Sequence, residues 1–410
     1  MSGPGLSALR DPEALQQADH GRLLAALGYA GAQVRVVSGQ RDRLPTVDRP
    51  RSLVVIGPSA PIDVALLSAV LGPAPAPVVA AADLPAWVGA LDVVVVLAGS
   101  VDDARSAAAG AVALRRGATT VVRAAAEGPV ADATRPALLP SELALPELLA
   151  APSRWALLAA VAAAAGLGAQ PDLDALADLL DAGAPALHPS AESFLNPAAN
   201  LAEHLGGGTP LLVGADAAAD ALLAHGAAVL TGLAGIVGGV LPSARAVGRP
   251  PVLARIGSER DIFADPFDDD AAQRVQPVLV STADPTGPDR AAAALVSGLR
   301  RAVPSAYHLD GWATAQAVPD GTVLPPAGQG FAEAAPPRTA GPEDPWARVF
   351  TAGRVLDATA AYLAVATGAP WPDDHPAGLG RSAGTRWDLR PVPAPADPDG
   401  STRESDQTWM

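Results

Sequence analysis

The sequence of 410 residues contains no cysteine and no lysine, and aromatic residues make up only 4% of it. Without cysteine the chain cannot form a disulfide, a thiolate metal site or a cysteine nucleophile, so small disulfide-stabilised secreted folds are excluded. Hydrophobic residues still make up 49% of the chain, so the interior must be filled largely by Ala, Val and Leu. This composition favours helices packed closely on sheets.

The sequence also has too little positive charge for a nucleic-acid-binding protein. Its 28 basic residues, all arginine, face 43 acidic ones, which gives a net charge of −15. Binding to a phosphate backbone requires a basic patch or stripe, and none is present. We therefore expect no nucleic acid partner.

Long hydrophobic runs and a secretion signal are absent as well. The first 18 residues include Arg10, Asp11 and Glu13 and have no continuous apolar core of the kind a signal peptide needs. The most apolar stretches, 156–169 and 227–241, have about 15 residues each, against the roughly 20 that a bilayer requires. We expect core helices there, no membrane partner and a cytoplasmic location.

The first half of the chain alternates short β-branched runs with Ala-rich helical stretches. The run Val93–Val96 is apolar on both faces, which is typical of a parallel sheet covered by helices on both sides. Residues 102–116 are predicted to form a crossover helix, with Asp102 as its cap. The predicted strands are Ala32–Val37, Ser52–Gly57, Pro77–Ala80, Asp92–Leu97 and Thr119–Arg123.

The same rhythm resumes in the second half, after two helices at 153–167 and 172–181. Helices are predicted at 217–240, 289–301 and 345–367, with an irregular loop at 319–345. The predicted strands are Pro210–Gly214, Val252–Ile256, Gln276–Ser281 and Ser305–Leu309. The fold class is therefore α/β, with two three-layer αβα domains built on parallel sheets. The predicted division is a helical lead with a first strand at 1–45, domains at 46–170 and 171–375, and a flexible tail at 376–410.

Two segments of the first half resemble a sugar isomerase (SIS) domain. The strand and loop Asp92–Asp103, continuing into Leu114–Ala118, are similar to the family's strand, hydroxyl-bearing loop and helix that ends in Gly-Ala. The upstream segment Leu53–Ser59 is similar to the earlier strand and loop that line the family's sugar site. The resemblance implies two SIS-type domains and a sugar-phosphate ligand.

The second half resembles the bifunctional phosphoglucose/phosphomannose isomerases. Asn196–Ala202 is similar to the entry to their second SIS domain, and Val355–Gly368, with its Tyr362, is similar to their C-terminal helix. Asp261–Asp268 resembles a segment of the actinobacterial TobH-like group, which is found with mannose-phosphate metabolism. The resemblance implies a homodimer, because in that family the sites are completed across subunits.

The loop that contains Gly99 and Ser100 is the predicted sugar-phosphate site, together with Ser59 and Arg135. Unpaired amides and the dipole at a helix N-terminus favour an anion there. However, Asp102 and the residue after it place two carboxylates beside the same position, and these would repel a phosphate. Phosphate binding and a purely structural turn remain equally open.

The catalytic residues of the resembled family are incomplete in this sequence. The family uses a Glu-Asn-Ala-Lys stretch, a His-Asn-Glu stretch and a C-terminal lysine, whereas residues 234–248 contain no carboxylate and the chain has no lysine. Glu259 and His308 are the candidate replacements for the base and the ring-opening histidine, although His308 beside Trp312 also suits a half-buried structural role. Two functions remain: a sugar-phosphate-binding protein without chemistry, or an active isomerase with relocated residues.

The acidic cluster Asp261–Asp270 is the remaining candidate site. Carboxylates suit calcium or magnesium, but the spacing matches no metal-binding loop, and a solvated turn with Asp265 capping a helix explains it better. We expect no metal and no cofactor.

Overall fold

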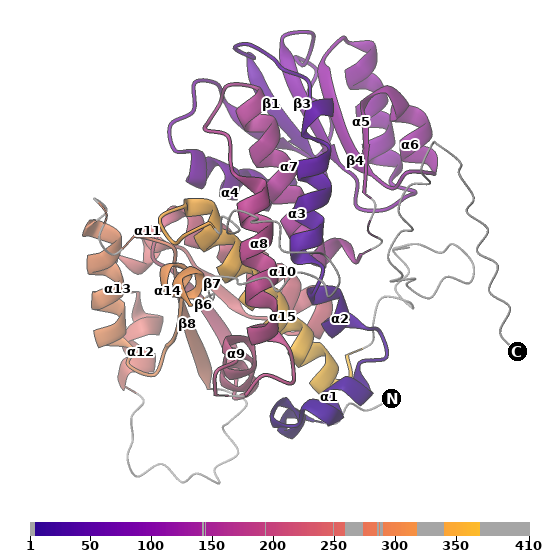
Figure 1. Cartoon of the computed structure of the whole chain (residues 1–410). Helices are drawn as coiled ribbons and strands as arrows, with labels where there is room; N and C mark the ends of the chain where they lie inside the picture. Colours follow the sequence, from indigo (N-terminus) through magenta and orange to yellow (C-terminus); the bar gives the residue numbers. More distant parts are fainter. Residues whose placement is uncertain are drawn as a thin grey trace, which may run out of the picture.

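The computed structural model describes residues 5–141, 143, 145–192, 194–248, 250–258, 274–284, 287, 290–317 and 340–369. In Figure 1 the chain forms two halves, each built around its own sheet, with long helices packed where the halves meet. Glu259, the Asp261–Asp270 cluster, most of the predicted loop at 319–345 and the predicted tail at 376–410 lie outside the described residues.

The first sheet has five parallel strands in the order β2-β1-β3-β4-β5. Its helices are α4 (Ala60–Leu71), α5 (Ala104–Arg115) and α6 (Pro129–Thr134). The strands are β1 (Ser52–Ile56), β2 (Val78–Ala81), β3 (Asp92–Leu97), β4 (Thr119–Ala124) and β5 (Leu138–Pro140). The parallel α/β sheet predicted for this half is confirmed.

Alternating residues of these strands enter two different apolar layers. On β3, Val93 and Val95 belong to the core that contains α4, whereas Val94 and Val96 belong to the core that contains α5 and α6. A strand buried on both faces needs apolar residues at every position, which explains the unbroken valine run. The first half is therefore a three-layer αβα unit.

The second sheet is also parallel and has the strand order β7-β6-β8-β9. Its strands are β6 (Thr209–Gly214), β7 (Gly239–Leu241), β8 (Val275–Ser281) and β9 (Tyr307–Asp310). One face packs on α9 (Pro197–Gly206), α10 (Ala217–Ala234) and α15 (Pro345–Thr367), and the other on α11 (Ser243–Ala246), α12 (Pro251–Ser258) and α13 (Arg290–Ala302). The short helix α14 (Gly311–Gln316) follows β9.

One continuous apolar core joins the inner faces of both sheets. It includes the helices α3 (Ala30–Gly39), α7 (Ala151–Ala164) and α8 (Leu173–Gly183), together with the N-terminal helices α1 (Pro12–Ala18) and α2 (Leu23–Leu27). The domain boundary predicted near residue 170 falls between α7 and α8.

Two predicted strands are wrong, because both segments are helices. Ala32–Val37 lies within α3, where Ala30, Val34 and Val37 are buried, a spacing of three and four that places them on one helical face. Val252–Ile256 lies within α12, where Leu253 and Ile256 are buried three residues apart. In both cases β-branched residues suggested a strand, but the buried positions follow the helical period.

The predicted helix 217–240 is too long, because α10 ends at Ala234. Gly235 adopts a left-handed conformation with φ 67°, and Ile236 N donates to Leu230 O, which is the Schellman ending of a helix. The chain then turns back to form the edge strand β7, which the sequence analysis missed.

Among the described residues, two helices, α10 and α15, are long and apolar enough to cross a membrane by length and composition. All of the most apolar window of α15 is buried inside the protein, as is 56% of that of α10. In this structure both helices therefore pack within the protein core. Of the second apolar stretch, 227–241, only residues 227–234 belong to a core helix, α10, whereas residues 239–241 form β7.

The two segments that resemble the second isomerase domain contact each other. Asn196 Oδ1 accepts from Ala198 N and Ala199 N at the start of α9, and its Nδ2 donates to Tyr362 Oη at 2.9 Å. The Tyr362 hydroxyl in turn donates to Leu187 O at 3.1 Å. Burial raises the pKa of Tyr362 to about 12, although the hydrogen bond from Asn196 acts in the opposite direction. These residues therefore have a structural role that links α9 to α15.

Replacing Tyr362 with phenylalanine is expected to lower the free energy of unfolding by about 1–3 kcal/mol, because it removes the hydroxyl that accepts from Asn196 Nδ2 and donates to Leu187 O. Asn196 Nδ2 keeps one acceptor, His188 O at 3.2 Å. Urea denaturation measures the effect. Tyr307→Phe is the control, since the half-buried Tyr307 hydroxyl makes one hydrogen bond, to Pro197 O. Equal stability of Tyr362→Phe and the wild type would contradict the structural role.

Candidate functional site

A cavity of about 340 Å³ lies at the carboxyl ends of β1 and β2, beside the start of α5. In parallel α/β sheets this edge is where ligands bind, and the volume lies within the range of small-molecule sites. Its polar side chains come from the first turn of α5. They are Asp103, Arg105 and Ser106. The predicted residues Ser59, Gly99 and Ser100 belong to the two loops beside this cavity.

Close contact between the loops after β1 and β3 requires two glycines. A Cβ atom on Gly57, whose φ is 150°, would lie 2.2 Å from Leu97 O. A Cβ atom on Gly99 would lie 2.8 Å from Pro58 Cγ. Any larger side chain at either position would push the two loops apart, so these glycines fix the edge of the cavity.

The Asp103 carboxylate occupies one of the hydrogen-bond donors that were predicted to hold a phosphate, the amide of Gly99. It accepts from Gly99 N at 3.2 Å and from Ser106 N at 3.0 Å, and Ser106 Oγ donates to it at 2.7 Å. Asp103 is thus the cap of α5, and the prediction that Asp102 caps this helix is wrong by one residue. Partial burial raises the pKa of Asp103, but these hydrogen bonds outweigh it and hold the pKa below its usual range.

A phosphate at the N-terminus of α5 would therefore have to displace a carboxylate that is already ionised and hydrogen-bonded. Arg105 offers a different contact, as the only basic residue that lines the cavity among the residues described. It pairs with Asp83 at 3.0 Å, and both side chains are about two-thirds or more exposed. Such exposed pairs contribute little stability, so Arg105 can exchange Asp83 for a ligand anion.

The Ser59 hydroxyl is directed into the protein rather than toward a ligand. Ser59 Oγ donates to Asp63 Oδ2 at 2.7 Å. The same carboxylate accepts from Arg154 Nε at 2.9 Å, and its other oxygen accepts from Trp155 Nε1 at 2.9 Å. Ser59 is therefore hydrogen-bonded to a buried carboxylate of α4.

Two more buried charged side chains, Glu147 and Arg123, lie beside the Asp63–Arg154 pair, and neither was predicted from the sequence. Arg154 Nη1 donates to Glu147 Oε1 at 2.9 Å, and Arg123 Nη1 lies 3.5 Å from Glu147 Oε2. Burial raises the pKa of Glu147 and lowers that of Arg123, although the opposite charge of each acts against the shift in the other. We name Asp63, Glu147, Arg123 and Arg154 the buried ionic cluster. The sequence signal was the lone Asp63 in the apolar helix α4, four residues after Ser59.

The structure does not bring Arg135 to the cavity. It precedes β5, on the amino-terminal side of the parallel sheet, whereas the loops with Ser59 and Ser100 follow the carboxyl ends of β1 and β3. Its guanidinium pairs with Asp132 at 2.6 Å, and both side chains are exposed.

His308 lies on β9 of the second sheet, and Ser281 Oγ is 3.0 Å from its Nε2. Burial lowers the pKa of His308 and Arg300 adds to this, although Asp310 acts in the opposite direction. The side chain is half-buried, as the structural interpretation of this histidine anticipated. His308 therefore belongs to the second sheet, whereas the loops with Ser59 and Ser100 follow strands of the first sheet. Glu259, its predicted partner in catalysis, lies outside the described residues.

The described residues contain no group of three or more His, Cys, Asp or Glu side chains that could hold a metal ion.

No protein-family model and no curated protein matches this sequence. Solved structures with a similar fold include a candidate phosphosugar isomerase from Bacillus subtilis, with 13% identity and a TM-score of 0.50 over 83% of this chain and 95% of that one. A hypothetical protein from Thermus thermophilus has 14% identity and a TM-score of 0.54 over 88% of each chain. A candidate phosphosugar isomerase from Clostridium difficile has 9% identity and a TM-score of 0.52 over 83% of this chain and 92% of that one. At these identities the similarity shows the fold alone, and the α/β architecture of SIS type predicted from the sequence is confirmed.

Proposed function

We propose that this chain is a sugar-phosphate-binding protein of the phosphoglucose/phosphomannose isomerase type, with degenerate catalytic residues and a role in mannose or glucose phosphate metabolism. The proposal includes a cytoplasmic location and a homodimeric state. The fold and the sequence resemblance support the ligand class, and the incomplete catalytic set supports the loss of chemistry.

One observation carries the binding site: the cavity at the carboxyl edge of the first sheet, which is lined by Asp103 and Arg105. A carboxylate can accept hydrogen bonds from sugar hydroxyls, and a guanidinium can bind a phosphate through two parallel hydrogen bonds. In this arrangement the phosphate binds Arg105 on the first turn of α5, while Asp103 continues to satisfy the loop amides near Ser100.

Replacing Arg105 with glutamine is expected to weaken sugar-phosphate binding by about tenfold or more, because a charge-assisted hydrogen bond contributes roughly 1.5–3 kcal/mol. Thermal unfolding of the full chain with glucose, mannose and fructose 6-phosphates measures the binding, since a ligand that binds only the folded state raises the melting temperature.

Arg115→Gln is the matched control, because Arg115 is an exposed arginine in the last turn of the same helix. It should leave the thermal shift unchanged.

Ser100→Asp adds a carboxylate to the loop beside the cavity and, like Arg105→Gln, should reduce the thermal shift. If Arg135→Gln abolished binding while Arg105→Gln did not, the phosphate would bind at Arg135, as predicted from the sequence, and the proposed contact with Arg105 would be wrong.

A further inference from the structure

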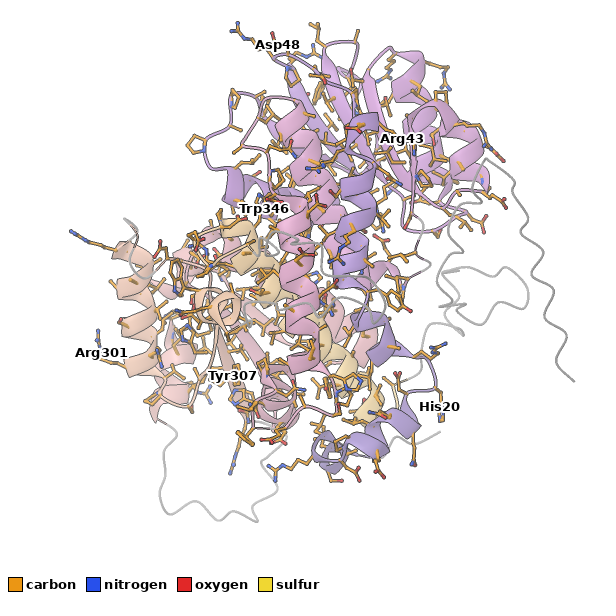
Figure 2. The ribbon with its side chains drawn as sticks, viewed as in Figure 1. His20, Arg43, Asp48, Arg301, Tyr307 and Trp346 are labelled. Atoms are coloured by element: carbon orange, nitrogen blue, oxygen red, sulfur yellow. The ribbon has the colours of Figure 1, made fainter. Side chains whose placement is uncertain are left out.

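The amino-terminal edge of the first sheet carries an exposed apolar loop. Residues 84–91 lead into β3 and contain no charged side chain. Trp87 is 49% exposed and Leu91 is 69% exposed, and the two alanines of the loop are exposed as well. In Figure 2 the labelled Asp48, shortly before β1, marks this edge at the top of the first half. The candidate cavity lies at the opposite, carboxyl ends of the strands.

The backbone of this loop is held in place without burying the Trp87 ring. Trp87 O accepts from Arg51 Nη2 at 2.6 Å. Gly89 N donates to Asp92 Oδ2 at 2.8 Å, and the Val88 side chain is buried in the core. Because these contacts fix the loop, its exposed side chains are presented in one arrangement, which reduces the entropy that a partner must overcome on binding.

Arginines flank the loop on both sides. The Arg51 guanidinium lies beside the Trp87 ring, with Cζ 5.6 Å from the ring centre, a cation–π distance. On the other side Arg116 Nη1 donates to Pro85 O at 2.9 Å. The strands β1, β3 and β4 are neighbours in the sheet, so the segments that lead into them lie side by side at this edge.

The charge of these arginines is only partly neutralised at the surface. Arg51 pairs with Asp92, but that carboxylate is completely buried while the guanidinium is half exposed. Arg49 and Arg116 are exposed, and neither forms an ion pair among the described residues. Asp48 is the exposed carboxylate next to Arg49 in the chain. This edge therefore combines an apolar centre with a positive rim, in a chain whose net charge is −15. We name Trp87, Leu91, Arg49, Arg51 and Arg116 the amino-edge surface.

We propose that the amino-edge surface binds an acidic peptide segment of another protein, one that carries carboxylates beside a large apolar side chain. The apolar side chain packs on Trp87 and Leu91, and the carboxylates pair with the arginines of the rim. Tryptophan and arginine are the residues that most often dominate the binding energy of protein interfaces, and a guanidinium can bind a carboxylate through two parallel hydrogen bonds. The inference goes beyond the proposed function, because it concerns the opposite end of the sheet and a different kind of ligand.

Charge favours a peptide over the other possible occupants of this surface. Two copies of this chain joined symmetrically through the same surface would place their arginines against each other. An anionic membrane would attract the rim but repel the rest of the chain, whose net charge is −15. A short acidic segment contacts only the locally positive surface, so it gains the attraction without that repulsion.

Selection of peptides from a random display library on the immobilised full chain tests the proposal. The enriched sequences should contain more Asp and Glu than the starting library, together with Leu, Phe or Trp. Fluorescence anisotropy of a labelled selected peptide then measures its dissociation constant. In Trp87→Ala this constant should rise by about tenfold or more, as expected for the truncation of a central interface residue. Arg116→Glu should raise it by a similar factor, and added salt should weaken the binding to the wild type.

Leu91→Glu is a second test that leaves Trp87 and Arg116 in place. The Leu91 side chain is exposed, so the change is compatible with the fold, and the new carboxylate repels an acidic peptide. Its dissociation constant should also rise, while the melting temperature of the free protein stays close to that of the wild type.

Phe194→Ala is the matched control for the loss of an exposed aromatic ring, because Phe194 is 70% exposed and precedes α9 in the other half. Arg301→Glu is the matched control for the reversed charge, because Arg301 is exposed at the end of α13 and projects away from the body in Figure 2. Both should leave the dissociation constant of the peptide unchanged.

No enrichment of acidic sequences, or selected peptides that bind the wild type, Trp87→Ala and Leu91→Glu equally, would overturn the inference. Binding to phosphatidylserine vesicles, or self-association in sedimentation, that is lost in Trp87→Ala in place of peptide binding would also overturn it, because the occupant would then be a membrane or a second copy. The thermal shift by sugar phosphates should be the same in Trp87→Ala as in the wild type. Failure of either proposal therefore leaves the other standing.

Discussion

Replacing Arg154 with leucine is expected to lower the free energy of unfolding by about 3–5 kcal/mol, because it removes one partner from a buried ion pair. The Arg154 guanidinium is 4% exposed and contacts Asp63, which is completely buried, and Glu147. Without the arginine, both carboxylates would remain in the core with fewer positive partners. Urea denaturation of the purified chain measures the difference.

Arg41→Leu is the control for losing an arginine ion pair at the surface. Its guanidinium lies 3.4 Å from Asp174, and both side chains are well exposed, so less than about 1 kcal/mol is expected. The double variant Asp63→Leu with Arg154→Leu should lose less stability than the two single changes summed, because neither charge is left alone. Additive single effects, or an Arg154 variant as stable as the Arg41 variant, would show that the buried ionic cluster does not act as a unit.

The parallel sheets were predictable because burial on both faces leaves a strong local pattern. A strand that is buried on both faces, such as the one containing Val93–Val96, needs an apolar residue at every position, and few other structural elements require this pattern. The final helix, Pro345–Thr367, was predicted with the bounds it has in the structure, since Asp344 and Pro345 signal its start and Gly368 its end. Short segments with a mixed pattern, α3 and α12, were misassigned because valine and isoleucine also pack well in buried helices.

The polar core could not be predicted from the sequence, because its partners lie far apart along the chain. Arg154 contacts Asp63 across 91 positions, and His225 contacts Asp357 across 132, at 2.7 Å. The apolar surroundings of His225 in α10 gave no indication of this contact. Only the three-dimensional packing of α10 on α15 brings the two side chains together.

At the candidate site, the sequence showed that two carboxylates follow the Ser100 loop, and this predicted a conflict with a bound phosphate. What the sequence could not show is which donors those carboxylates satisfy. In the structure Asp103 accepts from Gly99 and Ser106, so it replaces the phosphate at the helix N-terminus rather than merely repelling it. For this reason Arg105, rather than the amides of the Ser100 loop, is the residue proposed to bind the phosphate.

The purified protein is expected to show no measurable interconversion of fructose 6-phosphate with glucose or mannose 6-phosphate in a coupled assay. Moving a proton between C1 and C2 requires a positioned carboxylate base, and opening the ring requires an acid–base group such as histidine. Loss of each group typically lowers the rate by about 10² to 10⁴-fold. The chain has no lysine, and residues 234–248 contain no carboxylate.

The surviving candidates do not restore this set. His308 lies on the second sheet, where its Nε2 is 3.0 Å from Ser281 Oγ and burial lowers its pKa, so it is poorly placed to reach a sugar at the first-sheet cavity. Turnover above about 1 per second, abolished by Glu259→Gln or His308→Ala but not by the exposed His188→Ala, would establish an active isomerase with relocated residues. Binding of the same substrates without turnover is the expected result, because the ligand site and the chemistry depend on different residues.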